Sequence, residues 1–577
     1  MKSQKPVPHS WSQVVLAVAF MVIGAAASTA QYRVEKVPDC GIQFSAPNRL
    51  ERLPMQLGTN AVYQRARLRP KDTQDYVRAR YYWYCDVYSF AKKEQKAADI
   101  KLPEGVPESM REQFKELMAG MGRGERHKSF EDWLNAKEGI EIIQKGKLKK
   151  KKGKKLAYKH WVYLEDNGFG PVGQVYCEAA VYEFEDREVA LVIEMPLESK
   201  RPPKPKSKWY NIIKKVMRSG EACKAVAANA SSDKRDKYAD TPDRKKALED
   251  AKANIAGLNG WDYFTLPNYI VFYSWDFEKP SEKSKSRKKA LFYSERLEKM
   301  RELYIESYPL DPSGTKAIMP DPDSIPGLTG PITGKDDSKG KAAAAERLAE
   351  KSKELGKKPY SVFRLCATEE QFQKYGQSPP GVVGWYSPRS KELVVFLGGD
   401  RRMGAGATET VTYHEGWHQF ADFYFHPPES EKHATLHRWF DEGHGDYFGG
   451  FRWGSRGWSY KGSKMRYSAC KQMVRQEDYA PFKDIVRWDR RRFYGKNAPY
   501  YYAQAFSMID FFRRGHKSKG WQEKWGEIPE MYRRVILVKG DAKLAVDVAF
   551  RDFTDEDWAE LEEAWKAWVG SRKFLKG

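Results

Sequence analysis

Short apolar runs rich in Tyr, Val and Trp, separated by polar and charged stretches, recur through the first 225 residues. Runs of this length and composition are typical of β-strands. Strands are therefore predicted at residues 81–90, 156–164, 175–184 and 189–195. A polar helical stretch is expected at 107–119 and a closing helix at 209–218. Residues 31–225 are thus predicted to form a separate α+β domain, whose role the sequence does not identify.

Two later stretches lack the apolar pattern of folded elements. Residues 226–257 are charged and rich in Ala, which predicts a linker with some helix. Residues 309–358 contain an excess of Pro, Gly, Lys and Asp. That composition predicts a mobile insertion, with one short helix near 342–355.

Ordered elements resume at Trp261. They are a strand at 269–273, an amphipathic helix at 290–308, a strand at 361–366, a helical turn at 369–375 and a hairpin at 382–396. The hairpin is expected to turn at 387–390, which reads SPRS. These elements lead into a helix that carries an unusual arrangement of histidines.

An HExxH motif occupies this helix, with His414, Glu415 and His418 as its defining residues. On a helix, residues four apart lie on the same face, so both imidazoles can reach one metal ion. Glu415 lies about a quarter turn away, where it can hold a water molecule and accept its proton. An apolar stripe within about 60° of His414 supports the helix; it includes Val411, Ala421 and Phe425. The alternative is a pair of histidines hydrogen-bonded in a polar seam of the core.

A catalytic zinc site needs a third protein ligand and an open position for water. A metzincin would have Gly and His where this chain has Ala421 and Tyr424, so that class is excluded. A second pair at helical spacing, His433 and His437, lacks the intervening Glu. It is interpreted as a solvated polar face, with a second metal site as the alternative.

The third ligand is sought further along the chain. If residues 429–448 form one helix, Glu442 and Asp446 lie on one face and His444 lies roughly 140–180° away. Glu442 and His444 therefore cannot serve the same metal unless the helix breaks at a glycine beside His444. Asp446 lies one turn beyond Glu442, where it can accept a hydrogen bond from a ligand imidazole. All three remain candidates on this argument.

Residues 439–448 read WFDEGHGDYF, and residues 418–420 read HQF. Here the sequence resembles the gluzincins, whose zinc aminopeptidases carry a WLNEGFA-type helix with a Glu as third ligand. The resemblance implies this role for Glu442. The chain is also similar to poorly characterised bacterial peptidase-MA-like domains, in which HExxHQF precedes a W-x-x-EG-x-x-x-YF helix. The gap from His418 to Glu442 is a few residues longer than in the aminopeptidases.

The resemblance also implies an architecture for residues 258–577, namely a small mixed sheet followed by helices. In gluzincins the edge strand beside the metal helix binds peptide substrate as an additional strand; this implies such an edge near 393–397. Residues 502–507 resemble the Y-x-Q-x-x-S helix of the related domains. Tyr502 could therefore donate a hydrogen bond to an oxyanion. The alternative for Tyr502 is a packed core aromatic.

The first thirty residues resemble a secretory signal. Lys2 and Lys5 form a basic start, residues 14–27 are apolar but short for a bilayer span, and residues 28–30 are small. We therefore expect residues 1–30 to direct export to the periplasm, the cell envelope or the medium. The alternative is an uncleaved N-terminal anchor.

An even number of cysteines in an exported chain permits disulfides. The six are Cys40, Cys85, Cys177, Cys223, Cys366 and Cys470. The candidate pairs are Cys40 with Cys85 and Cys177 with Cys223. None of the six forms a CxxC metal pair.

The chain is strongly basic, with 101 Lys and Arg against 78 Asp and Glu and a net charge of +23. This balance favours anionic neighbours such as an envelope surface. Residues 145–155 read KGKLKKKKGKK and predict a solvated hairpin tip, whereas 201–208 read RPPKPKSK and predict a linker or loop. Neither run contains the interleaved aromatic residues of a nucleic-acid platform, so nucleic acid is not an expected partner.

Taken together, these features predict an exported α+β protein with zinc-dependent peptidase activity on a peptide or protein substrate. His414, His418 and Glu442 would hold zinc, which two imidazoles and one carboxylate favour, and Glu415 would be the general base. The alternative is a non-catalytic cell-surface or binding protein that retains a gluzincin-like fold. The sequence does not determine the oligomeric state.

Overall fold

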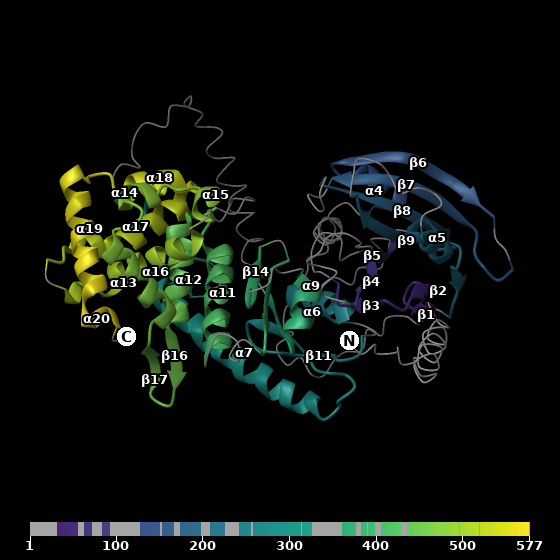
Figure 1. The fold of residues 1–577 in the computed structure, drawn as a ribbon, viewed down its shortest axis with the longest axis horizontal. Helices are drawn as coiled ribbons and strands as arrows, with labels where there is room; N and C mark the ends of the chain where they lie inside the picture. Colours follow the sequence, from purple (N-terminus) through teal and green to yellow (C-terminus); the bar gives the residue numbers. More distant parts are fainter. Residues whose placement is uncertain are drawn as a thin grey trace, which may run out of the picture. The chain divides into compact units, whose positions relative to one another are not determined.

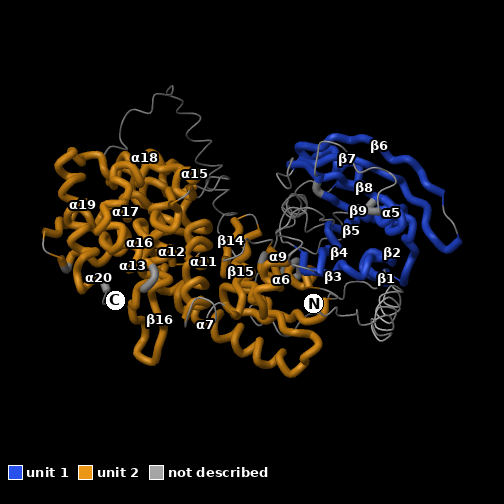
Figure 2. The backbone as a smooth tube through the Cα atoms, in the orientation of Figure 1, with its two compact units in different colours: residues 1–231 blue, residues 232–577 orange. Residues whose placement is uncertain are grey.

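The computed structural model describes most of the chain after residue 31. The described residues are 32–55, 63–71, 84–92, 127–150, 153–166, 173–197, 208–224, 242–255, 258–325, 360–376, 382–398, 406–427 and 435–575, apart from 313, 315, 389, 496 and 519. Two compact units are present, residues 1–231 and residues 232–577 (Figure 2). The predicted signal segment and the predicted helix at 107–119 lie outside the described residues.

Unit 1 is built on a seven-stranded sheet in which all neighbouring strands are antiparallel (Figure 1). In spatial order its strands are β3 (Leu50–Leu53), β4 (Gln64–Pro70), β5 (Tyr84–Ala91), β9 (Arg187–Pro196), β8 (Gln174–Glu183), β7 (Tyr158–Asp166) and β6 (Ile140–Lys149). The four strands predicted from the sequence are confirmed as β5, β7, β8 and β9.

Both faces of this sheet are covered. A three-stranded sheet and helix α5 pack on one face, and helix α4 packs on the other. These elements are β1 (Tyr32–Val37), β2 (Ile42–Pro47), β10 (Glu221–Ala222), α4 (Phe130–Asn135) and α5 (Lys208–Met217). Successive side chains of β9 point to opposite faces of the sheet and so enter the hydrophobic cores on both sides. Leu191 faces α5, whereas Ala190 and Val192 face α4. The predicted closing helix is confirmed as α5.

The candidate disulfide pairs are wrong, because all six cysteines are free thiols. Cys177 lies in the core beneath α4, whereas Cys223 follows β10 beyond the opposite face of the sheet, so the sheet separates them. Cys40 and Cys85 share the other core without bonding. Burial raises the pKa of the Cys85 thiol well above its usual range, so this thiol is neutral.

Unit 2 begins with a mixed five-stranded sheet. In spatial order its strands are β11 (Trp261–Thr265), β12 (Tyr269–Ser274), β13 (Ser361–Cys366), β15 (Glu392–Phe396) and β14 (Gly384–Ser387). The three central strands are parallel and the two outer ones antiparallel. The predicted strands and hairpin are confirmed, but the edge is not at 393–397. β15 pairs with β13 on one side and β14 on the other, so β14 forms the edge.

Part of the predicted linker belongs to the folded body of unit 2. Residues 242–255 form helix α6 (Pro242–Ile255), whose Arg244 and Asn254 are buried. Oδ1 of Asn254 accepts a hydrogen bond of 2.6 Å from Arg364 in β13. A polar helix is stable here because its polar groups find partners in the sheet.

The predicted insertion at 309–358 is also partly packed. It follows helix α7 (Glu282–Ser307), which confirms and extends the predicted amphipathic helix. Leu310 and Ile325 join the main hydrophobic core, so the first part of the insertion is fixed. Residues 326–359, including the predicted short helix, lie outside the described residues. Helix α9 (Glu369–Gly376) confirms the predicted helical turn.

The rest of unit 2 is mainly helical and rich in buried aromatic residues. Its elements are α11 (Ala407–Tyr424), α12 (Arg438–Gly449), β16 (Phe451–Gly454), β17 (Gly457–Tyr460), α13 (Lys464–Gln476), α14 (Phe482–Ile485), α15 (Arg490–Phe493), α16 (Ala498–Arg514), α17 (Glu523–Lys539), α18 (Ala542–Ala549), α19 (Asp555–Gly570) and α20 (Arg572–Leu575). The predicted α+β class is therefore confirmed. Within the described part of the chain, no helix has the length and apolar character needed to cross a bilayer.

Candidate metal centre

Helix α11 positions the HExxH motif. It begins after Gly406, whose φ of 83° suits glycine. Gly416, inside the motif, allows close packing on α7, because a Cβ there would lie 2.7 Å from Leu297 and 3.0 Å from Tyr304. The imidazoles of His414 and His418 face each other, with 3.0 Å between their Nε2 atoms. The predicted helix and the common direction of the two rings are therefore present.

Helix α12 brings a carboxylate to the same point. Oε2 of Glu442 lies 3.2 Å from Nε2 of His414 and 3.3 Å from Nε2 of His418. Zinc–ligand bonds of about 2.0–2.1 Å at tetrahedral angles would place neighbouring donor atoms about 3.3 Å apart. The three atoms could thus hold one metal ion, and they form the only such cluster of His, Cys, Asp and Glu found among the described residues.

Each imidazole has a carboxylate partner on its other nitrogen. Asp446 Oδ1 lies 3.3 Å from Nδ1 of His414, which agrees with the predicted position of Asp446. Asp441 Oδ1 lies 2.8 Å from Nδ1 of His418. The sequence analysis did not identify Asp441 as a partner of His418. Asp441 lies about 100° around the helix from Glu442, so a helical wheel places it off the face that carries Glu442 and Asp446.

Two arginines hold these carboxylates in place. Arg438 donates a hydrogen bond of 2.7 Å to Oδ2 of Asp441, and Nε of Arg466 lies 2.9 Å from Oδ2 of Asp446. Partners of this kind fix the orientation of ligand imidazoles. Both imidazoles are therefore aligned toward Glu442 by the surrounding protein.

The charges of the cluster favour a cation between the rings. Burial by itself lowers the pKa of His414, but the hydrogen bonds that its ring donates to the carboxylates of Asp446 and Glu442 raise this pKa to about 9. Burial likewise opposes protonation of His418, and the charges of Asp441 and Glu442 raise its pKa well above the usual value. Burial raises the pKa of Glu442, but the neighbouring imidazoles lower it well below its usual value. The carboxylates of Glu442 and Asp446, whose pKa values are both lowered, thus stay ionised beside the two rings.

Glu415 lies beside the cluster at the sheet edge. Burial raises the pKa of its carboxyl, and the nearby imidazoles together with a hydrogen bond from the backbone N–H of Tyr386 oppose this rise. Tyr386 belongs to β14, so the free edge of the sheet meets Glu415. The side chain of Tyr386 is anchored by a 2.6 Å hydrogen bond to Asp422 on α11. The Glu415 carboxylate, the cluster of His414, His418 and Glu442, and a strand edge therefore lie together.

Two tyrosines lie on the other side of Glu442. The hydroxyl of Tyr494 donates a hydrogen bond to Oε1 of Glu442. Tyr502 on α16 is hydrogen-bonded to Tyr494, with 6.0 Å between the ring centroids. Tyr502, the predicted site residue, therefore reaches the cluster through Tyr494. Tyr494 lies 52 residues from Glu442 along the chain, and no motif in the sequence marked it.

The other histidines that the sequence offered do not join the cluster. Helix α12 continues unbroken past both glycines beside His444, so this buried ring points away from His414. It is held by Phe440 O at 2.7 Å and by Tyr308 Oη at 2.6 Å, and it stacks on Trp417. His444 is therefore excluded as a third ligand.

The second histidine pair is described only in part. His433 lies outside the described residues, and the predicted helix at 429–448 begins only at Arg438. His437 precedes that helix, with Nδ1 3.2 Å from the hydroxyl of Tyr532. Burial lowers the pKa of His437 to about 4, so its imidazole is neutral.

The two glycines of α12 allow close approach of its neighbours. A Cβ at Gly445 would lie 2.8 Å from the ring of His414, and a Cβ at Gly443 would lie 2.6 Å from the carbonyl oxygen of Ala505 on α16. Side chains at these positions would displace the ring of His414 or the adjacent helix α16. The EGxG pattern in α12 is therefore explained by packing.

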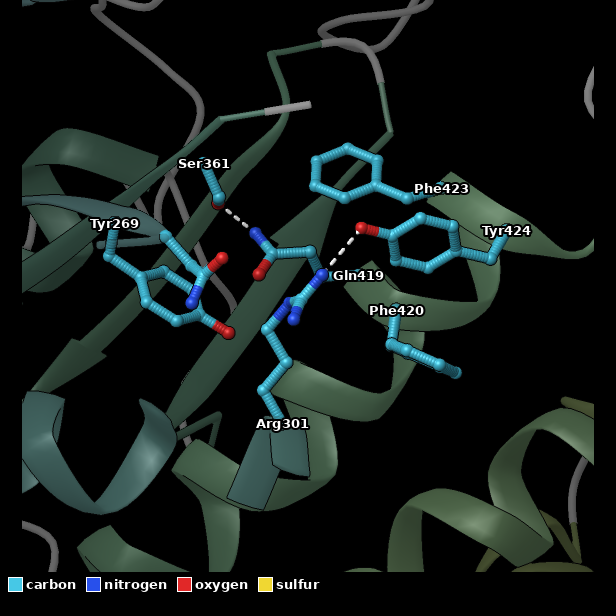
Figure 3. Close-up of a pocket in the computed structure, with 8 residues that line it drawn as sticks. Tyr269, Arg301, Ser361, Gln419, Phe420, Phe423 and Tyr424 are labelled. Atoms are coloured by element: carbon cyan, nitrogen blue, oxygen red, sulfur yellow. Dashed lines mark hydrogen bonds between the residues drawn. The ribbon is translucent and has the colours of Figure 1, made fainter. Parts of the chain in front are cut away.

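A small pocket lies away from the metal cluster, between α11 and the sheet (Figure 3). Figure 3 shows Gln419 pointing toward Ser361, to which its amide donates a hydrogen bond. Arg301 donates a 2.7 Å hydrogen bond to the hydroxyl of Tyr424 at the same pocket. These contacts join α11 to β13 and α7, so the polar residues of the pocket hold helix α11 against the sheet and α7.

Neither a comparison with protein-family models nor a comparison with curated proteins produced a match. The cluster of His414, His418 and Glu442 is thus defined by its geometry.

Proposed function

We propose that unit 2 is a zinc-dependent peptidase of the gluzincin type. The observation that carries the proposal is the position of Glu415. This carboxylate lies next to a triad of metal-binding geometry and against the free edge of β14. A purely structural metal site has no use for such a base. The HExxHQF and WFDEGHGDYF motifs support the same proposal.

When bound, zinc supplies Lewis acidity that lowers the pKa of a water molecule toward about 7 and polarises a carbonyl oxygen. His414, His418 and Glu442 would hold the ion. Glu415 accepts the proton of the attacking water at its carboxylate and then donates it to the leaving amine. Its raised pKa suits a group that must both accept and release a proton.

The substrate would bind as an additional strand along β14. Among the described residues, no strand pairs with the outer edge of β14, and Tyr386 brings that edge to Glu415. Backbone hydrogen bonds then align an extended peptide, whatever its side chains. This arrangement would place a scissile carbonyl beside the base.

The proposal is tested with two substitutions and a control. Glu442→Ala should abolish zinc binding, whereas Glu415→Gln should keep about one zinc per chain and lower peptide cleavage by roughly 10²–10⁴-fold. Glu409→Gln makes the same chemical change on the same helix, at a carboxylate that contacts Tyr413, and should retain both properties. Elemental analysis and peptide-library cleavage measure the two effects.

The alternative function is a non-catalytic surface or binding protein. Zinc in the parent without any cleavage that depends on Glu415 would favour this alternative. An absence of zinc after reconstitution would overturn the peptidase proposal as a whole.

Tyr502 is proposed as the donor to the oxyanion of the substrate. Tyr502→Phe should then lower kcat by about 10²-fold while zinc affinity changes little. Equal losses in both properties would instead assign Tyr502 to support of Tyr494 and Glu442.

We also propose that residues 1–30 direct export. The N-terminal sequence of the exported protein tests this, because cleavage predicts a chain that begins at Gln31. A retained Met1 at a membrane would support the anchor alternative.

A further inference from the structure

Strand β6 forms one edge of the seven-stranded sheet of unit 1 (Figure 2). It extends over Ile140–Lys149, and within the described part of unit 1 its one partner strand is β7. Its pairing is irregular at two places, between Ile142 and Gln144 and between Gln144 and Lys147. The lysine-rich segment predicted as a hairpin tip thus begins inside this strand, with Lys145, Lys147 and Lys149.

The β6–β7 hairpin carries an unusual concentration of positive charge. Residues 142–160 contain nine lysines and no Asp or Glu. Lys147, Lys150 and Lys154 are exposed. Two other lysines are neutralised from outside the segment, Lys145 by Glu131 at 2.6 Å and Lys159 by Glu183 at 2.5 Å. The hairpin therefore keeps a large excess of positive charge.

Large aliphatic side chains are exposed among these lysines. Leu148 is 64% exposed, Ile143 is 50% exposed and Ile142 is 37% exposed. Burying such side chains is favourable by about 25 cal/mol per Å² of apolar surface. Exposed aliphatic groups beside lysines therefore need a partner that is both apolar and anionic.

Two classes of partner fit this surface poorly. Irregular pairing and lysines on an edge strand discourage the addition of another strand. Nucleic-acid platforms use aromatic rings on which bases stack, and the exposed large apolar residues of the hairpin are aliphatic. We propose that the β6–β7 hairpin binds the surface of an anionic lipid bilayer. Its lysines contact the headgroups, and Ile143 and Leu148 enter the boundary of the acyl chains.

A second lysine-rich surface provides an internal control. Lys285, Lys288 and Lys289 are exposed near the start of α7. Acidic residues accompany this surface, including Asp276, which pairs with Lys279, and Asp262, which pairs with Lys283. Charge reversal there changes the net charge of the chain equally but leaves the hairpin intact.

The test is co-sedimentation with vesicles of neutral phosphatidylcholine and with vesicles that contain 30% phosphatidylglycerol. The protein is the chain from Gln31 onward, which retains every described element and lacks the apolar N-terminal segment. The charge variant is K147E/K150E/K154E, and its control is K285E/K288E/K289E. The aliphatic variant is I143S/L148S, and its control is V34S, at a residue that is 62% exposed on β1.

The parent should bind anionic vesicles far better than neutral ones, and binding should weaken with salt. The charge variant should lose about 100-fold in partitioning, since each basic side chain near an anionic surface contributes roughly fivefold. The aliphatic variant should lose about tenfold, whereas both controls should change by less than about threefold. Circular dichroism should be the same for all five proteins.

Three outcomes for the parent and the charge variant would overturn the proposal. They are no binding of the parent to anionic vesicles, equal losses in the charge variant and its control, and tighter binding to a DNA fragment than to vesicles. If the aliphatic variant binds anionic vesicles as well as the parent does, the hairpin attracts polyanions in general without inserting apolar side chains. That result would also contradict the proposal. None of these outcomes depends on zinc or on peptidase activity.

Discussion

The hydroxyl of Tyr494 donates a hydrogen bond to Oε1 of Glu442, and this leaves Oε2 as the carboxylate atom that faces both imidazoles. A carboxylate held in this way offers a single oxygen to a metal. Coordination through one oxygen leaves space for a water molecule at a fourth position, as catalytic zinc sites require.

Removing this hydrogen bond should loosen Glu442, the proposed third ligand. Tyr494→Phe is expected to weaken zinc affinity by about 10–100-fold, the usual effect of losing a partner of a ligand. Competition with a chromophoric chelator measures the change. Tyr501→Phe is the matched control, because Tyr501 packs on Trp488 and should leave zinc affinity unchanged. Equal affinities of the parent and Tyr494→Phe would show that Glu442 orients itself without help.

Asp441 should support His418 as Asp446 supports His414. Asp441→Asn is expected to lower zinc affinity by about 10–100-fold, because Nδ1 of His418 loses a charged partner at 2.8 Å. The control is Asp422→Asn on α11. Asp422 is half-buried and ion-paired with Lys391 at 2.5 Å, and it accepts a hydrogen bond from Tyr386. Comparable losses in the two variants would point to general damage to α11.

Two glycine substitutions should separate ligand geometry from helix packing. Gly445→Ala places a Cβ against the ring of His414 and should reduce zinc affinity strongly. Gly443→Ala meets the backbone of α16 and should destabilise the fold by about 1–3 kcal/mol. Gly570→Ala is the control, because its Cβ meets nothing within 4 Å. Thermal unfolding with and without zinc distinguishes the effects; a Gly445→Ala protein with parental affinity would contradict the first prediction.

Unit 1 contains a carboxyl whose ionisation should depend on folding. Burial, together with the charge of Asp86, raises the pKa of Glu194 to about 7, although Arg69 opposes the rise. The folded chain then binds more protons than the unfolded chain between pH ~4.5 and ~7. Stability should therefore fall as the pH rises through this interval.

Glu194→Gln should remove this dependence. The free energy of unfolding of the variant should exceed that of the parent by about 1–3 kcal/mol at pH 8 and by little at pH 5. Urea unfolding at the two pH values measures this difference. Glu185→Gln, at an exposed turn, should change neither value by more than about 0.5 kcal/mol. A constant difference between parent and Glu194→Gln across this range would contradict the raised pKa.

Much of the candidate site could be predicted because its information is local. His414 and His418 share a face through helical spacing alone, and Glu442 follows from the α12 motif. A helical-wheel projection also placed His444 and Glu442 on opposite faces of one helix, and the structure agrees because α12 is unbroken there. The strands of both units were predictable from composition for the same reason.

Other features were not predictable because they depend on long-range contacts. β14 became the edge strand through the pairing of β15 with β13, and no residue in the hairpin encodes that order. Arg244 and Asn254 look like linker residues until β13 and Tyr360 supply their partners. The pair of Cys177 and Cys223 failed because a sheet lies between them, whereas Cys40 and Cys85 share one core without bonding.

By itself, the sequence determined which side chains a single helix presents together, because backbone geometry repeats every few residues. Only the tertiary structure decided which helices meet. It brought Tyr494 to Glu442 across 52 residues, placed Asp441 on His418, and set Glu415 against the edge of the sheet. These contacts arise from packing of whole elements, and packing depends on shape and volume across the core.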